Sequence, residues 1–396
     1  MLISEDSEYD LTENNSFGMK DVAKADSEFV PRIYSKVTSK HEGNLIMSAL
    51  SIECVLAVAS LGSKGNTEKE IKKTFSLPSN PKSLSHGFSE VMKVLNTDQK
   101  ESVTTEVSNH VYIRKGAKLL DDFEKNTNKI QKGIIKHVDF SNAAKTTQQI
   151  NDQVKKDTKG KITNLFSEDS IDASTQLVFV NALYFKGKWK SEFNKRMTAE
   201  GEFYVSADKN VQADLMRTQG QYSVVDIKNV DARALQLPYK GDRFSMVVIL
   251  PNDRDGFKKL EQDLSKIDFS KDIQFDKPSK TYQVTLPKFK IETSMGLVSA
   301  LKELGIKDLF DAAKADLSGF TGSKGMFASA LVQKAFIEVN EEGTEAAAAT
   351  GMVVSSRSLS MPPSFICDHP FIFFIKDSKT GLILFTGRVM DPKSQE

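Results

Sequence analysis

Cysteine, histidine and tryptophan are scarce in this sequence, and their scarcity excludes several classes of protein. Among 396 residues there are 2 Cys, 5 His and 1 Trp. Cys54 and Cys367 cannot form the framework of a small disulfide-linked scaffold, so we expect two free thiols. The histidines lack the paired spacing of a zinc site, and no nucleophile elbow or phosphate-binding loop is present. We therefore expect no metal, no required cofactor and no catalysis by this chain.

An excess of charge and long apolar runs are also absent. Because 54 basic residues balance 53 acidic ones, the net charge is +1, which gives no overall attraction to nucleic acid or to an anionic membrane. No apolar run approaches the roughly 20 residues of a spanning helix. The first residues, MLISEDSEYDLTENNS, have neither the basic start nor the apolar centre of a signal peptide. The protein is then either intracellular or secreted with its signal already removed.

The chain is expected to have an acidic tail followed by one α+β domain. Residues 1–18 are acidic and aperiodic, which predicts a solvated, disordered tail; the alternative is a segment around Tyr9 that docks on a basic protein. Helical spacing of apolar residues predicts helices at 20–39, 51–62, 67–75, 83–95, 119–130 and 144–158. Strands are predicted at 106–114, 177–185, 222–227, 232–239, 244–250, 282–291, 331–340, 370–376 and 382–389. No long linker interrupts residues 19–396, so they are expected to form a single domain with large, mainly antiparallel sheets.

Residues 341–363, EEGTEAAAATGMVVSSRSLSMPP, do not fit a core. A connection of this length between two apolar strands is usually functional or disordered. Arg357 is the only Lys or Arg between Ala335 and Ile375, so a trypsin-like protease that meets an exposed loop here has one place to cut. An exposed arginine alone is ordinary, and a surface loop cut by accident would show the same feature.

The pattern in residues 344–357 gives the arginine more weight. If this segment becomes a strand, one face carries only uncharged side chains: Thr344, Ala346, Ala348, Thr350, Met352, Val354 and Ser356. Such a face can enter a core, while Glu345 on the other face stays in water. Alanine loses no side-chain entropy on burial, which lowers the cost of changing state. The segment is therefore a loop that is able to become a buried strand.

At this point the sequence resembles the serpin family of serine protease inhibitors over about residues 20–392. The stretch EEGTEAAAAT at 341–350 is similar to the hinge of inhibitory members. The other matching stretches are NLIMS at 44–48 with Ser51, FVNALYFKGKW at 179–189, LPKF at 286–289, DLSG at 316–319 and HPF at 369–371. The family's usual proline is replaced by Ala49. The order and number of these motifs make the resemblance specific.

The resemblance implies a fold, a mechanism and a set of site residues. It implies three β-sheets, about eight to nine helices and an exposed reactive-centre loop at about 341–363. The protease would cut Arg357–Ser358, and residues 344–357 would then insert into the central sheet and trap the acyl-enzyme. The implied hinge comprises Glu341, Gly343, Thr344, Glu345, Ala346, Ala347, Ala348 and Ala349. The implied sheet-opening region comprises Ser48, Ser51, Asn181, Trp189, Lys288 and Gln333, with Lys288 expected to pair with Glu341 as an exposed ion pair or as an incidental surface contact.

Two departures from the family pattern leave alternatives open. Many relatives have a histidine where Gln333 stands, so the polar cluster of the sheet-opening region must be bonded differently here. The distance from Arg357 to Pro370 is longer than usual, and counting back from Pro370 would favour Leu359 as the scissile residue. Counting forward from Glu341 gives Arg357, which we prefer because the inserted length sets how far the protease is carried.

The partners are expected from resemblance and charge together. The stretch from Gln333 to Thr350 is most similar to arthropod body-fluid serpins, which implies a secreted monomer, a trypsin-like target such as a clip-domain protease, and a role in innate immunity. A carrier or storage serpin is the rival, but such members usually have bulky or charged hinges. Basic stretches predict a heparin-like polysaccharide as rate enhancer, or merely a solvated face. They comprise Lys155, Lys156, Lys159, Lys161, Lys186, Lys188 and Lys190, with Lys195 and Arg196 nearby.

Overall fold

The computed structural model describes residues 17–96, 98–99, 102–167, 170–278, 280–344 and 361–394, with the backbone alone for Asp98, Gln99 and Thr344. Within these ranges the α-helices are α1 Met19–Thr38, α2 Ala49–Gly62, α3 Gly65–Phe75, α4 Pro81–Leu95, α5 Asp121–Ile130, α6 Ala143–Asp157, α7 Phe257–Asp263, α8 Val298–Glu303 and α9 Ser318–Thr321. Short 3₁₀ helices are η2 Lys195–Met197, η3 Leu264–Lys266 and η4 Asp308–Phe310. The six predicted helices match α1 to α6 to within three residues at each end.

A central sheet contains seven strands, in the order β11-β12-β5-β3-β2, with β4 on β3 and β13 on β5. These strands are β2 Asp98–Gln99, β3 Val103–Arg114, β4 Ile135–Val138, β5 Leu177–Lys188, β11 Phe289–Gly296, β12 Ala330–Val339 and β13 Gly343–Thr344. β5 is buried from Leu177 to Phe185, as its continuous apolar run predicted. The strand therefore has packed layers on both faces.

A second network has nine strands, in the order β1-β16-β15-β9-β8-β7-β10-β14, with β6 on β7. They are β1 Leu45–Met47, β6 Ala199–Ser206, β7 Lys209–Ile227, β8 Ala232–Pro238, β9 Phe244–Pro251, β10 Lys280–Pro287, β14 Ser364–Ile366, β15 Phe371–Asp377 and β16 Ile383–Val389. The end of β7 pairs with β8 and its start pairs with β6 and β10, so this long strand belongs to two sheets. Together with the central sheet they make the three sheets of an α+β fold, which confirms the predicted fold class.

The single strand predicted at 282–291 is wrong, because two strands of different sheets occupy this stretch. β10 ends at Pro287 and β11 begins at Phe289. Buried positions are even-numbered at Val284 and Leu286 but odd-numbered at Phe289 and Ile291, so the inward face changes between them. The strand β6 and the first half of β7 were not predicted, because this ribbon is largely exposed and has weak alternation.

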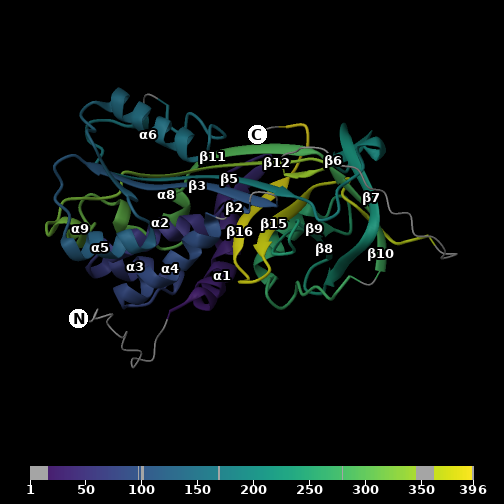
Figure 1. The fold of residues 1–396 in the computed structure, drawn as a ribbon, viewed down its shortest axis with the longest axis horizontal. Helices are drawn as coiled ribbons and strands as arrows, with labels where there is room; N and C mark the ends of the chain where they lie inside the picture. Colours follow the sequence, from purple (N-terminus) through teal and green to yellow (C-terminus); the bar gives the residue numbers. More distant parts are fainter. Residues whose placement is uncertain are drawn as a thin grey trace, which may run out of the picture.

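The helices cover the central sheet unequally (Figure 1). α6 lies on one face, over a small hydrophobic cluster that includes Tyr112, Ile150 and Val180. The remaining helices of the described chain and the second strand network lie on the other face, around the main core. α2 forms the centre of that core because nearly all its residues are buried. Cys54 and Cys367 are free thiols, as predicted; both are buried, and burial raises the pKa of both thiols.

The N-terminal end is packed where the structure describes it. Residues 1–16 of the expected tail lie outside the described residues, whereas the ring of Phe17 lies 6.3 Å from that of Phe88 on α4. No helix in the described ranges is long and apolar enough to cross a membrane. No group of three metal-ligating side chains capable of holding an ion is found in the same ranges.

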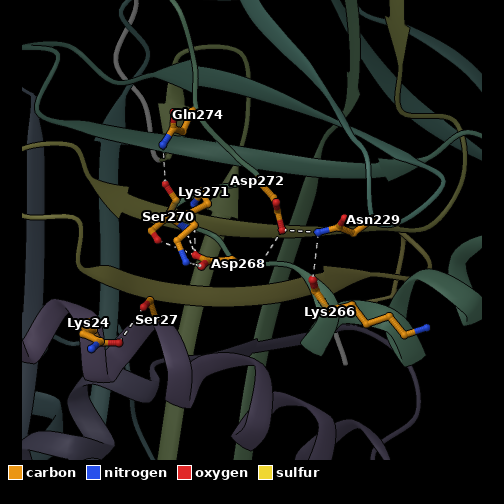
Figure 2. A network of polar contacts seen from close by, with 9 residues as sticks. All are labelled: Lys24, Ser27, Asn229, Lys266, Asp268, Ser270, Lys271, Asp272 and Gln274. Atoms are coloured by element: carbon orange, nitrogen blue, oxygen red, sulfur yellow. Dashed lines mark hydrogen bonds and ion pairs between the residues drawn. The ribbon is translucent and has the colours of Figure 1, made fainter.

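A polar network closes the exposed turn between η3 and β10 (Figure 2). Asp268 forms an ion pair with Lys271 at 2.8 Å and accepts a hydrogen bond from the Ser270 hydroxyl. These two partners hold the pKa of Asp268 below its usual value. Asp272 Oδ2 accepts from the Asn229 side chain at 2.8 Å and from the backbone N–H of Asp268 at 2.8 Å. The network stabilises its own turn and has no contact with the loop at 341–363 among the described residues.

Two carboxyl groups are buried together between α1 and α2. Asp26 and Glu53 are 0% and 2% exposed, and Asp26 Oδ1 and Glu53 Oε1 have no hydrogen-bond partner among the described residues. The other oxygen of Asp26 accepts from the N–H of Ile383 at 2.7 Å. Burial raises the pKa of Asp26 to about 8 and also raises that of Glu53, whose carboxyl is repelled by Asp26. The folded protein therefore binds protons here that the unfolded chain releases.

This pair makes a contribution to stability that is lost as the pH rises. The folded pKa of Asp26 lies above its unfolded value of 3.8, so the pair's contribution to the free energy of unfolding is complete below about pH 4 and is lost up to about pH 8. Replacing Glu53→Gln removes one acid and supplies a donor, so unfolding measured in urea across this range should show a shallower decrease and about 2–4 kcal/mol more stability at high pH. Glu42→Gln, at an exposed carboxylate, is the control and should follow the wild-type curve; equal slopes in all three proteins would contradict the assignment.

Candidate functional site

The central sheet has an opening at one end, between β5 and β12. The two strands run parallel and pair directly from Val178 with Ala330 to Phe185 with Ile337. Beyond that point β13 pairs with β5 in the antiparallel sense, Gly343 with Lys188 and Thr344 with Gly187. Thr344, the first residue of the segment that was predicted to insert, therefore already pairs with β5, as does Gly343 before it.

Only glycine can occupy position 343, because the backbone of β5 lies so close to it. Its φ is +141°, and a Cβ placed there would lie 2.0 Å from the carbonyl oxygen of Gly187. A turn precedes it, in which the Gly343 N–H donates to the carbonyl of Asn340 and the Asn340 N–H donates to that of Gly343. This turn reverses the chain from β12 into β13.

Two neighbouring glutamates anchor the turn. Glu341 is 5% exposed, lies 3.4 Å from Lys288 and accepts from the Thr198 hydroxyl at 2.8 Å. Burial would raise the pKa of Glu341, but its backbone N–H, Thr198 and Lys288 together hold it below the usual value. Glu342 is 2% exposed and pairs with Lys195, whose pKa this bond raises. The predicted pair of Lys288 with Glu341 is present, and its carboxylate is buried rather than exposed.

Trp189 connects the end of β5 to the same turn. Its indole N–H donates to the carbonyl of Asn340 at 2.9 Å, and its backbone N–H donates to that of Glu342 at 3.0 Å. The indole stacks on Tyr239 with ring centroids 4.6 Å apart and an interplanar angle of 8°. The tryptophan thus fixes the chain just before the hinge to a rigid aromatic pair.

A buried polar cluster lies under the middle of the β5–β12 pair. The Gln333 amide accepts from the N–H of Ser48 and donates to its carbonyl, both at 2.9 Å, and also donates to Asn181. Asn181 in turn donates to Ser51 and to Asn109, and the Ser51 hydroxyl donates to Asn109 at 3.0 Å. All five residues are 0% exposed. A glutamine side chain here has both a donor and an acceptor, so it closes a network that includes the N-terminus of α2.

Sequence reasoning missed four of these site residues. Asn109 lies on β3 directly opposite Asn181, and Thr198, Lys195 and Glu342 hold the hinge. The signal that could have identified Asn109 is its place between Val107 and Val111, the apolar residues on either side of it on the same face of the strand. Thr198 and Lys195 follow β5 in a segment with no clear pattern, so nothing in the sequence indicated their contact with a turn about 145 residues later.

The predicted basic residues differ in their surroundings. Lys159 pairs with Glu106, Lys190 pairs with Asp242 at 2.7 Å, and Lys161 lies over the Tyr184 ring. Lys155 and Lys156 are exposed in the last turn of α6. Lys186 and Lys188 lie on the outer face of β5 and are half-buried. A polar groove of about 260 Å³ lies beside α6 and is lined by Gln148, Asn151, Asp152, Lys155, Thr163 and Asn164.

Arg357, Ser358 and the hinge residues Glu345, Ala346, Ala347, Ala348 and Ala349 lie outside the described residues. The chain is described again from Met361, which is 84% exposed. The described parts of the loop therefore comprise a start on β5 and an end that leads into β14.

Comparison with known proteins identifies the family. Residues 24–392 match a family model described as "Serpin (serine protease inhibitor)". The chain belongs to the serpin family. Human leukocyte elastase inhibitor is 35% identical over 384 residues, which cover 94% of this chain and 100% of that protein. The crystal structure of Serpin48 from the insect Tenebrio molitor is similar with a TM-score of 0.84 and 34% identity, over 94% of this chain and 98% of that chain.

A further solved structure broadens the comparison. Native protease nexin-1 with heparin has a TM-score of 0.84 and 30% identity, over 95% of this chain and 100% of that chain. The family and the fold that were expected from sequence motifs are confirmed. This serpin is accordingly a member of a family of serine protease inhibitors.

The polar cluster gives a direct test of the sheet's central contact. Replacing Gln333→Leu leaves the Ser48 N–H and the Asn181 side-chain oxygen buried without a partner, and the Ser48 carbonyl retains only its bond from the Ile52 N–H. We expect a loss of about 2–4 kcal/mol in the free energy of unfolding, measured in urea, because each orphaned buried group costs about 1–3 kcal/mol. Gln274→Leu, at an exposed glutamine, should change stability by less than about 0.5 kcal/mol. Equal effects of the two changes would show that the Gln333 contacts contribute nothing.

Proposed function

We propose that this serpin inhibits trypsin-like serine proteases by being cut at Arg357–Ser358 and then inserting residues 344–357 into its central sheet. The observation that carries the proposal is the register of β13. Thr344 pairs with Gly187, on the face of β5 that points into the main core, and Gly343 pairs with Lys188 on the outer face. Continued in that register, the even-numbered residues from 344 to 356 all face the core, and none of them is charged.

The same register matches polar groups to polar groups. Position 350 falls opposite Asn181, so the hydroxyl of Thr350 would enter the cluster where Gln333 now contacts Asn181. Position 345 falls opposite Lys186 on the outer face, so Glu345 would meet a cation at the sheet surface. Val354 falls opposite Leu177, the first residue of β5. The segment therefore suits the full length of β5 in both polarity and length.

The proposed inhibition uses the chemistry of the protease and the mechanics of the sheet. The catalytic serine attacks the carbonyl of Arg357 and forms an acyl-enzyme, as it does with a substrate. The cut frees the segment to insert, and fourteen residues at about 3.3 Å each carry the attached protease by roughly 46 Å. Insertion exchanges one parallel ladder between β5 and β12 for two antiparallel ones, which supplies new hydrogen bonds and buries the even-numbered face. The inhibitor contributes no catalytic group in this scheme.

The proposed target is a secreted clip-domain protease of innate immunity. An arginine at position 357 favours a protease that has a carboxylate at the bottom of its specificity pocket. The similarity to Serpin48, a serpin of an insect, supports this choice of target. A cut at Leu359 is the alternative, because leucine suits the pocket of elastase-like or chymotrypsin-like enzymes, and the name of the human relative refers to leukocyte elastase. We propose that residues 19–396 act as one monomeric unit.

Mixing the protein with trypsin tests the proposal. We expect a complex that survives SDS at the summed mass, and a released C-terminal peptide that begins at Ser358 by mass spectrometry. Thr344→Arg should turn the inhibitor into a substrate, because an arginine would have to enter the core beside Gly187. Glu345→Arg is the matched control on the outer face and should still trap trypsin. A peptide that begins at Ser360 would assign the bond to Leu359, and normal trapping by Thr344→Arg would refute insertion.

A sulfated polysaccharide is proposed as an accessory ligand rather than a required cofactor. Support comes from the exposed Lys155 and Lys156 and from the likeness to native protease nexin-1, whose structure was solved with heparin. The ion pairs of Lys159 and Lys190 reduce the free charge, so we expect weak, salt-dependent retention on a heparin column. Lys155→Gln with Lys156→Gln should shift elution to lower salt. Elution of the wild type without added salt would end this proposal.

A further inference from the structure

The central sheet has an exposed strand edge at β4. This strand has four residues and pairs only with β3 within the described part of the chain, from Val111 with Ile135 to Arg114 with Val138. β2 lies on the same side of β3 but pairs with the other end of that strand. No described strand therefore covers the outer edge of β4.

The bonds between β4 and β3 show which backbone groups of β4 point outward. The Lys115 N–H donates to the carbonyl of Val138 at 2.7 Å, so the carbonyl of Val138 points toward β3. Successive residues of a strand direct their N–H and C=O groups to opposite edges, so those of Ile135 and His137 point away from β3. These four groups have no hydrogen-bond partner among the described residues. His137 is exposed and Ile135 is half-buried, so a partner can reach them.

The chain that leads into β4 is strongly basic. Residues 125–138 contain four lysines and no acidic residue. Lys129 and Lys132 are exposed and Lys136 is half-buried, and the structure gives none of the three an ion pair or a hydrogen bond within the described ranges. Asp139 directly follows the strand, so a single acid there is set against four cations. The edge therefore has an excess of positive charge.

The two faces of β4 differ in a way that selects the partner. Lys136 pairs with Tyr112, so both side chains lie on the face of the sheet that α6 covers, whereas Ile135 packs against the main core on the other face. Lysine on an edge strand normally protects it from pairing, because a neutral partner would have to desolvate the charge. An acidic partner avoids this cost, since its carboxylates meet the ammonium groups. The edge therefore suits a strand in which acidic residues alternate with apolar ones.

We propose that the edge of β4 binds an acidic, extended segment of a partner protein, which joins the central sheet as an additional strand. The backbone of that segment bonds to the outward N–H and C=O groups of Ile135 and His137. Its carboxylates lie near Lys132 and Lys136. The site does not depend on the proposed inhibitory function, because none of these residues belongs to the loop at 341–363 or to β5 and β12.

Two synthetic peptides of equal charge separate strand addition from simple attraction. In the first, of about eight residues, Glu alternates with Val, which matches the edge in alternation and charge. We expect this peptide to bind the full-length protein, measured by the fluorescence anisotropy of a label, and to bind more weakly as salt is raised. In the second, Glu alternates with Pro, which cannot donate, so its affinity should be at least about tenfold lower. Equal binding of the two peptides would overturn the proposal, because it would show attraction by charge alone.

A proline in β4 tests the backbone contact. His137→Pro removes one outward N–H and leaves the ladder to β3 intact, since proline is tolerated on an edge whose N–H faces solvent. It should weaken binding of the Glu-Val peptide by about tenfold. His137→Thr is the matched control: it also removes the imidazole but keeps the N–H and a good strand former, so it should bind as wild type does. Equal affinities of these two variants would show that the edge forms no backbone bond to the peptide.

Paired lysine substitutions test the charge contact. Lys132→Gln with Lys136→Gln should weaken binding of the Glu-Val peptide by about fivefold, because exposed charge pairs are individually weak. Lys155→Gln with Lys156→Gln removes the same charge from the last turn of α6 and should leave binding unchanged. A larger effect of the second pair would place the peptide on α6 and contradict the assignment.

Hydrogen exchange in the wild type reports on the edge without any substitution. The Ile135 and His137 amides should exchange quickly in the free protein and about tenfold more slowly when the Glu-Val peptide is near saturation. The Lys115 amide, which already bonds to Val138, should be protected in both states. Unchanged exchange at saturation would show that the peptide binds elsewhere. Slow exchange in the free protein would show that this chain or a second copy already covers the edge, and would equally overturn the proposal.

Discussion

The parallel pairing of β5 with β12 is the interaction on which the rest of this structure depends. It joins the two halves of the central sheet through one ladder, from Val178 with Ala330 to Phe185 with Ile337. A parallel ladder is slightly less stable per residue than an antiparallel one, and a strand that enters between the two partners in the opposite sense makes two such ladders. Under the proposed mechanism, loop insertion would replace this one parallel ladder with two antiparallel ones.

The residues around this ladder form contacts across it and at both ends of the loop. Gln333 and Asn181 hold the two strands together by side chains from within the core, and the same cluster reaches the start of α2. At the open end, Glu341 and Trp189 fix the turn before β13. Gly343 and Thr344 are the described residues of the loop that pair with β5. At the other end of the loop, β14 pairs with β10, and Asp368 just beyond it pairs with Arg254.

Much of this could be predicted from the sequence because it depends on local pattern. The α1 to α6 helices, the buried strand at Leu177 and the uncharged face of residues 344–356 all follow from periodicity and residue type. Contacts between distant residues could not be predicted in the same way. Asn109 opposite Asn181, Lys195 with Glu342, and the Arg254 bond to Asp368 join segments that no periodicity relates. The change from one sheet to another at Lys288 was missed as well. The buried positions switch there from even to odd numbers, but the apolar residues on both sides form one continuous pattern that hid the switch.

The most direct test of the account is the thermal unfolding of the protein after its loop is cut by a protease that it does not trap. Insertion predicts that the cut protein unfolds at a much higher temperature than the intact one, and that backbone amides from Thr344 to Val354 become protected from exchange in the register that places Thr350 opposite Asn181. A cut protein that unfolds at the same or a lower temperature, with those amides unprotected, would contradict it.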